Sequence, residues 1–348
     1  MKQKIAVDCS KLNTHEKTGT HRFLVGFLNE LVKNKNYDYY FYYDSFNPEL
    51  NNFNFLKKGK LVCLNRNYLY TQVGLLMELN KYDKFIFPWQ TLPFLGIFSR
   101  CSKIAIIHDT GFSFKTKIFT FFTQLFADKL FAVSEFTASK LIRKSVVIPE
   151  GVDSETFYKI PLNDLVLRRK ELNIPEYFIL SLGRVEKRKN VYNNLVAFNL
   201  VQKFIPKLKY VFVGQIVEDE EKINSFIEAL GIPRSSIVFK KYISDEDLNV
   251  YLNSMELMLF TPESEGFGLP VLEAYAVQKP VILSRIQPLA EISLSANQFV
   301  DFNNPKDIAE KTINFLKKNE SIKSPKSFKN LLNQFSWERS ASIFFKNL

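Results

Sequence analysis

Short apolar runs and amphipathic stretches alternate along the whole of this 348-residue chain. The apolar runs span about four to eight residues and are rich in β-branched and aromatic side chains, which is typical of buried strands. The strands expected on this basis are Ile5–Asp8, Tyr39–Tyr43, Leu61–Leu64, Lys84–Pro88, Ile104–His108, Leu130–Ser134 and Val146–Pro149, followed by Phe178–Leu182, Tyr210–Val213, Ile237–Phe239, Leu257–Phe260, Val281–Ser284 and Phe299–Phe302. Helices are expected between them, for example at Arg22–Lys33, Phe136–Arg143, Val191–Phe204 and Lys222–Leu230. This alternation predicts an α/β fold with parallel sheets covered by helices on both faces.

The chain is long enough for two domains, each with its own core. A polar stretch containing Pro161 and Pro175 separates the two sets of strands. We therefore expect Rossmann-like, doubly wound domains at residues 1–160 and 161–335. Sheets of this kind bind ligands beyond the carboxyl ends of their strands.

The net charge of +11 favours anionic partners such as phosphorylated small molecules, nucleic acid or an acidic membrane. Lys and Arg are spread along the chain, so a nucleic-acid partner is not favoured. Cys9, Cys63 and Cys101 form no CxxC pair, which fits a reducing cytoplasm and argues against a zinc site. No signal peptide and no run of roughly 20 apolar residues is apparent, so we expect a cytoplasmic protein. The 34 Phe residues are interpreted mainly as core.

The segment Leu257–Ser284 carries the strongest chemical signal. Its expected strand ends at Phe260, and a glycine-containing turn then leads into a helix with Pro270 at its start. The amides of Gly266–Leu269 would face a ligand with the helix dipole behind them, which predicts an anion site. Glu265 and Glu273 flank these amides. Each Glu taken alone is as well explained by solvent exposure or by the helix dipole, but ribose and hexose hydroxyls beside a diphosphate would suit both.

A second candidate lies after the strand Phe178–Leu182, where Gly183 and Arg184 precede Lys189 at the start of a helix. Two cations beyond a strand end suit a diphosphate and the charge that builds on a leaving group. A solvated basic loop is the simpler interpretation, because Lys187 and Arg188 stand in the same run.

The first half offers two weaker candidates. Gly19 lies between the first strand and the first helix, where a plain turn is the simpler interpretation. His108 closes an expected strand, and a lone His is more often structural than functional.

Together these motifs resemble the retaining GT-B glycosyltransferases of the family 4, E-x7-E type, also described as group 1. The matching segments are "TGTHRF", "HD" at His108, "VSEFTASKL", "VIPEGVD", "GRVEKRKN" and "ESEGFGLPVLEAYAVQKPVI", in family order over nearly the whole chain. The resemblance implies two Rossmann-like domains facing across a cleft, with residues 336–348 as a terminal helix that crosses back to the first domain. It also implies a nucleotide-sugar donor, either GDP-mannose or a UDP-sugar, and a saccharide or lipid-linked saccharide acceptor in cell-surface polysaccharide biosynthesis.

The same resemblance assigns roles to individual residues. It implies that Glu265 contacts the transferred sugar, Glu273 the ribose, and Arg184 and Lys189 the diphosphate, while His108 contacts the sugar or transition state. The implied donor-binding set is Gly19, Gly183, Arg184, Lys189, Glu265, Gly266, Phe267, Gly268, Leu269 and Glu273, and the implied catalytic set is His108, Glu265, Arg184 and Lys189. The nucleotide base is expected near Lys240–Tyr242. Three departures from the family are His21, where many relatives have a glycine, Glu150, where an Asn is usual, and Val277-Gln278-Lys279, where a glycine is usual.

Asp245-Glu246-Asp247 spells the DxD metal motif of another glycosyltransferase fold. We instead expect Ser244 to cap a helix that starts at Asp245, because acidic residues in a first helical turn need no metal. The expected enzyme therefore uses no metal and no cofactor.

Two alternatives stay open. A GT-B nucleotide-sugar epimerase or phosphorylase is a different enzyme class, and a basic nucleic-acid-binding protein is less favoured. The stretch Lys115–Phe131 is interpreted as a core helix followed by a strand, but its Lys and Phe content also suits a helix lying on an anionic membrane, on the inner face of the cell membrane.

Overall fold

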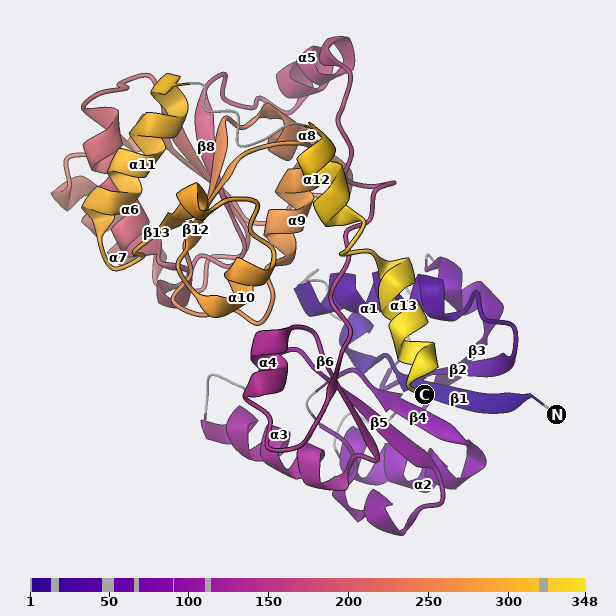
Figure 1. The fold of residues 1–348 in the computed structure, drawn as a ribbon. Helices are drawn as coiled ribbons and strands as arrows, with labels where there is room; N and C mark the ends of the chain where they lie inside the picture. Colours follow the sequence, from indigo (N-terminus) through magenta and orange to yellow (C-terminus); the bar gives the residue numbers. More distant parts are fainter. Residues whose placement is uncertain are drawn as a thin grey trace. The chain divides into compact units, whose positions relative to one another are not determined.

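A computed structural model describes residues 2–13, 19–45, 53–65, 69–89, 91–109, 114–318 and 325–348. The chain divides into two compact units (Figure 1). The first comprises Met1–Gly151 and Ser336–Leu348, and the second comprises Val152–Phe335.

The first unit is built on a parallel sheet of seven strands in the described residues, in the order β3-β2-β1-β4-β5-β6-β7. The strands are β1 Gln3–Asp8, β2 Tyr37–Tyr43, β3 Lys60–Cys63, β4 Lys84–Phe87, β5 Ser102–Ile107, β6 Lys129–Ala132 and β7 Val146–Val147. The helices are α1 Gly19–Leu31, α2 Leu76–Glu78, α3 Phe114–Phe126, α4 Glu135–Ser139 and α13 Trp337–Lys346. Neighbouring residues of a strand face opposite sides of the sheet. In β6, Phe131 contacts Phe344 of α13, whereas Leu130 joins a core cluster with Phe85 and Phe87.

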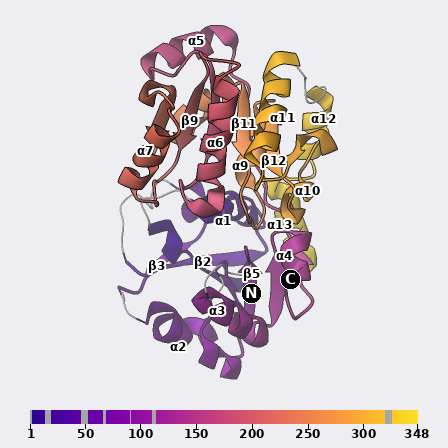
Figure 2. The same ribbon diagram turned by 90° about the vertical axis from the view of Figure 1, so that its left-hand side faces the viewer.

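The second unit holds a parallel sheet with the order β10-β9-β8-β11-β12-β13. Its strands are β8 Phe178–Leu182, β9 Lys209–Val213, β10 Ile237–Lys240, β11 Leu257–Phe260, β12 Val281–Ser284 and β13 Phe299–Val300. Its helices are α5 Leu162–Glu171, α6 Val191–Gln202, α7 Glu220–Ala229, α8 Asp245–Ser254, α9 Leu269–Ala276, α10 Gln287–Glu291, α11 Pro305–Lys318 and α12 Pro325–Leu332. Helices α6 and α11 pack side by side on one face, and α9 and α12 pack on the other (Figures 1 and 2).

Every strand expected from the sequence is present, and the expected pair of Rossmann-like parallel sheets is confirmed. One helix was wrong in extent, because α4 ends at Ser139 and does not reach Arg143. The physical reason lies in the next segment, where the Ile142 amide donates to the Gln124 side chain at 2.7 Å instead of to a helical carbonyl.

The connection after Gly151 packs with the second unit. The Ile160 amide donates to Asn253 Oδ1 at 3.0 Å, and Asn253 Nδ2 donates back to Tyr158 O at 2.9 Å. Asn253 lies on α8 and is buried. These bonds explain why the division falls at Gly151, earlier than residue 160 where the sequence placed it.

Helix α13 completes the first unit. A Cβ on Gly26 of α1 would collide with the Trp337 ring, and a Cβ on Gly151 would collide with the backbone at Ser336 and Trp337. The Trp337 and Phe344 rings meet Phe23 and Phe27 of α1 edge-on. The two glycines therefore let α13 approach α1 closely. Among the described residues, no helix is both long and apolar enough to cross a membrane.

The C-terminal turn of α9 contains Gln278 at φ 61°, in the left-handed region that favours glycine. Left-handed backbone costs an L-residue roughly 1–2 kcal/mol, whereas the extra unfolded-state freedom of glycine offsets roughly 0.5–1 kcal/mol of any gain. We expect Gln278→Gly to raise the free energy of unfolding by about 0.5–1 kcal/mol, measured by urea denaturation.

The reciprocal control is Gly231→Ala. Gly231 has φ +69°, and nothing lies within 4 Å of an added Cβ, so only backbone strain is introduced. This variant should lose about 1 kcal/mol. If Gln278→Gly were neutral or destabilising, the glycine usual at this position in similar sequences would have a reason other than its backbone.

Candidate functional site

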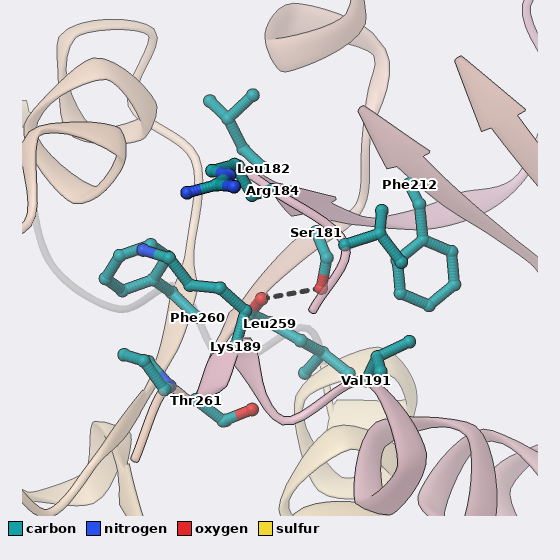
Figure 3. Close-up of a pocket in the computed structure, with 12 residues that line it drawn as sticks. Ser181, Leu182, Arg184, Lys189, Val191, Phe212, Leu259, Phe260 and Thr261 are labelled. Atoms are coloured by element: carbon teal, nitrogen blue, oxygen red, sulfur yellow. Dashed lines mark hydrogen bonds between the residues drawn. The ribbon is translucent and has the colours of Figure 1, made fainter. Parts of the chain in front are cut away.

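Strands β8 and β11 are neighbours in the second sheet, and the strand order reverses between them. From β8 the sheet continues through β9 and β10, while from β11 it continues through β12 and β13. Their following loops therefore leave the sheet in opposite directions, which opens a crevice at the carboxyl edge. A pocket lies here, shown in Figure 3, and it is lined by Ser181–Val185, Lys189, Val191, Phe212 and Leu259–Pro262.

The loop after β8 starts with a tight turn. Gly183 has φ +122°, which an L-residue rarely adopts, and its amide donates to Val213 O at 2.9 Å. A Cβ on neighbouring Gly214 would collide with Gly183 O. Gly183 and Gly214, neighbours in space, thus let the ends of β8 and β9 lie against each other, and Arg184 follows at the pocket.

Lys189 and Glu265, singled out separately from the sequence, lie together. Lys189 Nζ donates to Glu265 Oε2 at 2.5 Å and lies 5.0 Å from the centroid of the Phe260 ring. Both side chains are largely buried, with 17% and 20% exposed. The ion pair therefore ties the loop after β8 to the loop after β11.

Arg188 joins Lys189 and Glu265 to form what we call the Lys189 cluster, and the sequence did not single it out. Its guanidinium bonds Glu186 Oε1 at 2.7 Å and Ser264 O at 3.0 Å, and it lies 3.7 Å from Glu265 Oε2. The simpler interpretation of the basic run at Lys187 and Arg188 as a solvated loop is thus wrong for Arg188, whose side chain is only 27% exposed. Its partners come from both loops, and no local pattern reports that.

Arg184 is held more loosely. Half of its side chain is exposed, and Nη1 lies 3.9 Å from Glu186 Oε2, at the limit of an ion pair. It is therefore the pocket cation best placed to turn toward an incoming anion.

Helix α9 begins beside this cluster. Gly268 precedes it at φ +115°, and an added Cβ would lie 2.8 Å from Leu289 Cδ2. Phe267 and Leu269 are buried on either side of Gly268, so neither presents its side chain to solvent. Glu273 lies one turn into α9 and is only 2% exposed. The ribose contact that the resemblance implies for Glu273 stays a prediction.

The DxD motif behaves as expected from the sequence. Ser244 Oγ accepts a hydrogen bond from the Asp247 amide at 3.0 Å, which confirms the predicted cap of α8. Asp247 also pairs with Arg168 at 3.1 Å. Within the described ranges no cluster of three or more His, Cys, Asp or Glu side chains could hold a metal ion.

Lys240 ends β10, and nearby Tyr242 is exposed, so the region where the nucleotide base is expected is open to solvent.

His108 lies just after β5 in the first unit and is buried. Its Nε2 lies 3.0 Å from Pro88 O and its Nδ1 lies 3.4 Å from Glu150 Oε1. Because a carbonyl only accepts, Nε2 carries a proton. Glu150, which replaces the usual Asn, therefore belongs to the surroundings of His108.

Gly19 is the first residue of α1, and residues 14–18 before it lie outside the described ranges. One buried charged group was missed from the sequence: Asp8, which closes β1, is 1% exposed. Asp8 Oδ1 accepts from the Ser10 amide at 3.0 Å and from the Tyr70 hydroxyl at 3.3 Å. Burial raises the pKa of Asp8 to about 6, and the charge of Asp44 adds to this, although the hydrogen bonds act in the opposite direction.

Asp8 makes the stability of the first unit depend on pH. Its folded pKa of about 6 exceeds the ordinary value of 3.8, so the folded state binds its proton more tightly. The resulting contribution to the free energy of unfolding is fully present below the ordinary pKa and is lost as the pH rises through about 6. Its full size is on the order of 3 kcal/mol. Asp8→Asn, which cannot ionise, should therefore gain stability relative to the wild type between pH 4 and pH 7.

Thermal unfolding of both proteins across this range measures the effect, and shared titrations cancel in the difference. An equal difference in melting temperature at the two ends of the range would show that Asp8 does not titrate there.

Comparisons with known proteins bear on the second unit most directly. Residues 166–330 match the family model described as "Glycosyl transferases group 1". This segment is therefore similar to a glycosyltransferase group 1 domain. This domain contains β8, α9 and all members of the Lys189 cluster.

The chain is similar to two kinds of named mannosyltransferase. The chain is 28% identical over 176 residues to the serotype-specific mannosyltransferase WbdA of Escherichia coli, covering 48% of this chain and 22% of WbdA. It is 26% identical over 223 residues to O-antigen chain mannosyltransferase B of Escherichia coli, covering 61% of this chain and 58% of that protein. The chain thus spans about a fifth of the length of WbdA.

The fold extends beyond the glycosyltransferase domain. Anabaena HepE, solved in complex with UDP and glucose, superposes with a TM-score of 0.81 at 14% identity, covering 99% of each chain. The expected GT-B fold is confirmed on this ground. The enzyme class expected from the sequence, a glycosyltransferase, agrees with the group 1 domain.

Proposed function

We propose that this chain is a retaining glycosyltransferase that moves a hexose from a nucleotide-sugar donor to a saccharide or lipid-linked saccharide in cell-surface polysaccharide biosynthesis. The observation that carries the proposal is the Lys189–Glu265 ion pair beside the pocket at the reversal of strand order. It places a cation for phosphate next to a carboxylate for sugar hydroxyls.

The comparisons support this class of reaction. The two relatives named above are mannosyltransferases, one of them an O-antigen chain mannosyltransferase, and HepE was solved with UDP and glucose. The nucleotide in the HepE complex is UDP and the names of the mannosyltransferases give no nucleotide, so the proposal keeps both GDP-mannose and UDP-sugars as donors. The group 1 domain does not favour an epimerase, a phosphorylase or a nucleic-acid-binding protein.

In the proposed mechanism the residues that follow β8 bind the donor diphosphate. Arg184 and Lys189 contact its oxygens, and the backbone from Gly266 to Leu269 lies at the start of α9, where the helix dipole favours negative charge. These groups stabilise the nucleoside diphosphate as the bond to the sugar breaks. Three cations, Arg184, Arg188 and Lys189, stand against the carboxylates Glu186 and Glu265, so the cluster keeps a net positive charge.

The sugar side of the proposal uses the carboxylates. Glu265 binds hydroxyls of the transferred hexose, and Glu273 binds the ribose. The acceptor hydroxyl attacks the anomeric carbon on the face from which the diphosphate leaves, and it passes its proton to the departing phosphate oxygen. His108 is proposed to contact the transferred sugar. It is not assigned as a base, because both of its nitrogens have partners. The cations take the place of a metal, and no cofactor takes part.

Nucleotide binding tests the site. Arg184→Ala should weaken binding of UDP or GDP about 10- to 100-fold, because a hydrogen bond to a charged group is worth about 1.5–3 kcal/mol. Lys187→Ala is the matched control: it removes the same charge from the same loop, but Lys187 is exposed and does not line the pocket. Isothermal titration calorimetry of the three proteins measures both effects. Equal affinities for the two variants, or no nucleotide bound by the wild type, would refute the site.

The reaction itself is tested by its product. With the preferred donor, the anomeric configuration of the new bond, read by proton NMR, should match that of the α-linked donor. EDTA should leave the initial rate unchanged, because cations of the protein neutralise the diphosphate. An inverted product would reject the retaining mechanism, and a rate restored only by a divalent metal would reject metal independence.

A further inference from the structure

Helix α3 is amphipathic in the reverse sense. Three of its polar residues, Thr120, Thr123 and Gln124, are buried. Its exposed face is apolar, with Phe114 81% exposed and further exposed side chains at Ile118, Phe121, Phe122 and Leu125. These five positions follow a spacing of three or four residues and form one stripe along the helix.

The hydrogen bonds of the buried face fix this orientation. Gln124 Oε1 accepts from the Ile142 amide at 2.7 Å, and Gln124 Nε2 donates to Thr120 O at 3.3 Å. At the end of α3, Arg143 Nη1 donates to Ala127 O at 2.7 Å. The bonds from Ile142 and Arg143 come from outside α3, and rotating the helix to bury its apolar stripe would break them. The stripe therefore faces outward.

A neighbouring short helix, η6 Phe94–Phe98, extends the apolar surface. Phe94 packs against Phe119, Phe122 and Phe126 of α3, which joins the two elements. Leu95 and Ile97 are exposed, and Phe98 is 82% exposed. We call the exposed apolar residues of η6 and α3 the aromatic face; they are Leu95, Ile97, Phe98, Phe114, Ile118, Phe121, Phe122 and Leu125.

The charges around this face select its partner. Neither η6 nor α3 contains an acidic residue. Exposed Lys117 lies on α3, exposed Arg100 follows η6, and exposed Lys144 follows the Ile142–Arg143 contact with α3. The half-exposed Asp128 beyond α3 is paired with Lys103 at 2.7 Å. An apolar stripe bordered by cations suits the headgroup layer of an anionic bilayer, where aromatic rings enter the interface and cations meet phosphate.

We propose that the aromatic face is a membrane-docking surface that lays α3 in the interface of an anionic bilayer. Helix α3 has 13 residues, well short of the roughly 20 that span a bilayer, so it lies along the surface. The sequence-based preference for a core helix at this segment is corrected in this respect: helix and strand form as expected, but much of the apolar side faces outward.

Vesicle sedimentation tests the proposal. The wild type should bind phosphatidylcholine vesicles containing phosphatidylglycerol, and binding should fall with added salt or without the anionic lipid. The double variant Phe98→Ser/Phe114→Ser should lose at least about tenfold in partition coefficient, because two exposed rings leave the interface. Lys117→Glu should weaken binding to anionic vesicles only.

The matched control is Phe204→Ser, which removes a ring that is 62% exposed on the second unit and should bind vesicles like the wild type. Phe114→Leu, which keeps an apolar side chain, should retain most of the binding and so separates loss of apolar contact from misfolding. Nucleoside diphosphate affinity, measured in parallel, should be unchanged in all these variants, which keeps this test independent of the donor site.

Three results would overturn the proposal. One is binding of the double variant equal to that of the wild type. Another is equal binding to neutral and anionic vesicles. The third is a wild-type dimer in light scattering that the double variant abolishes, which would make the aromatic face an interface between copies of the chain.

Discussion

The reversal of strand order between β8 and β11 is the constraint on which the candidate site depends. It separates the loops that follow two adjacent strands, and it leaves a crevice between them without any special side chain. The Lys189–Glu265 pair then joins the two loops, and Arg188 adds a second tie through Ser264 O. Fold topology provides the crevice, and a small set of charges gives it a preference for anions beside hydroxyls.

The sequence predicted what depends on local pattern. Strand positions followed from short apolar runs, and the cap at Ser244 followed from its spacing to Asp247. Arg188 and Asp8 were missed, because the roles of both depend on partners far away in the chain, at Glu265 and Tyr70. Gly19, His108 and Glu273 were candidates from their positions, but their roles came from the resemblance and stay predictions.

Composition was a poorer guide to location than pattern was. Many of the aromatic residues do form the core, as with Phe23, Phe27 and Phe41. Several Phe residues of α3 are exposed instead, since buried Gln124 bonds the Ile142 amide and so fixes which side of the helix faces the protein. Hydrophobicity along one helix cannot tell which side faces the protein, because buried hydrogen bonds can outweigh an apolar stripe when the neighbouring segment offers matching groups.

The close packing of Trp337 on Gly26 and Gly151 has a consequence for synthesis of the protein. The first unit is made of two separate chain segments, and the whole second unit lies between them in sequence. A ribosome therefore finishes Val152–Phe335 before it releases Ser336–Leu348. Although domains generally fold from the N-terminus as they emerge, here the N-terminal unit is the last to be completed. Until α13 is synthesised, the rings of Phe23, Phe27 and Phe131 lack their contacts with Trp337 and Phe344. The nascent protein then contains a complete second unit and an incomplete first one.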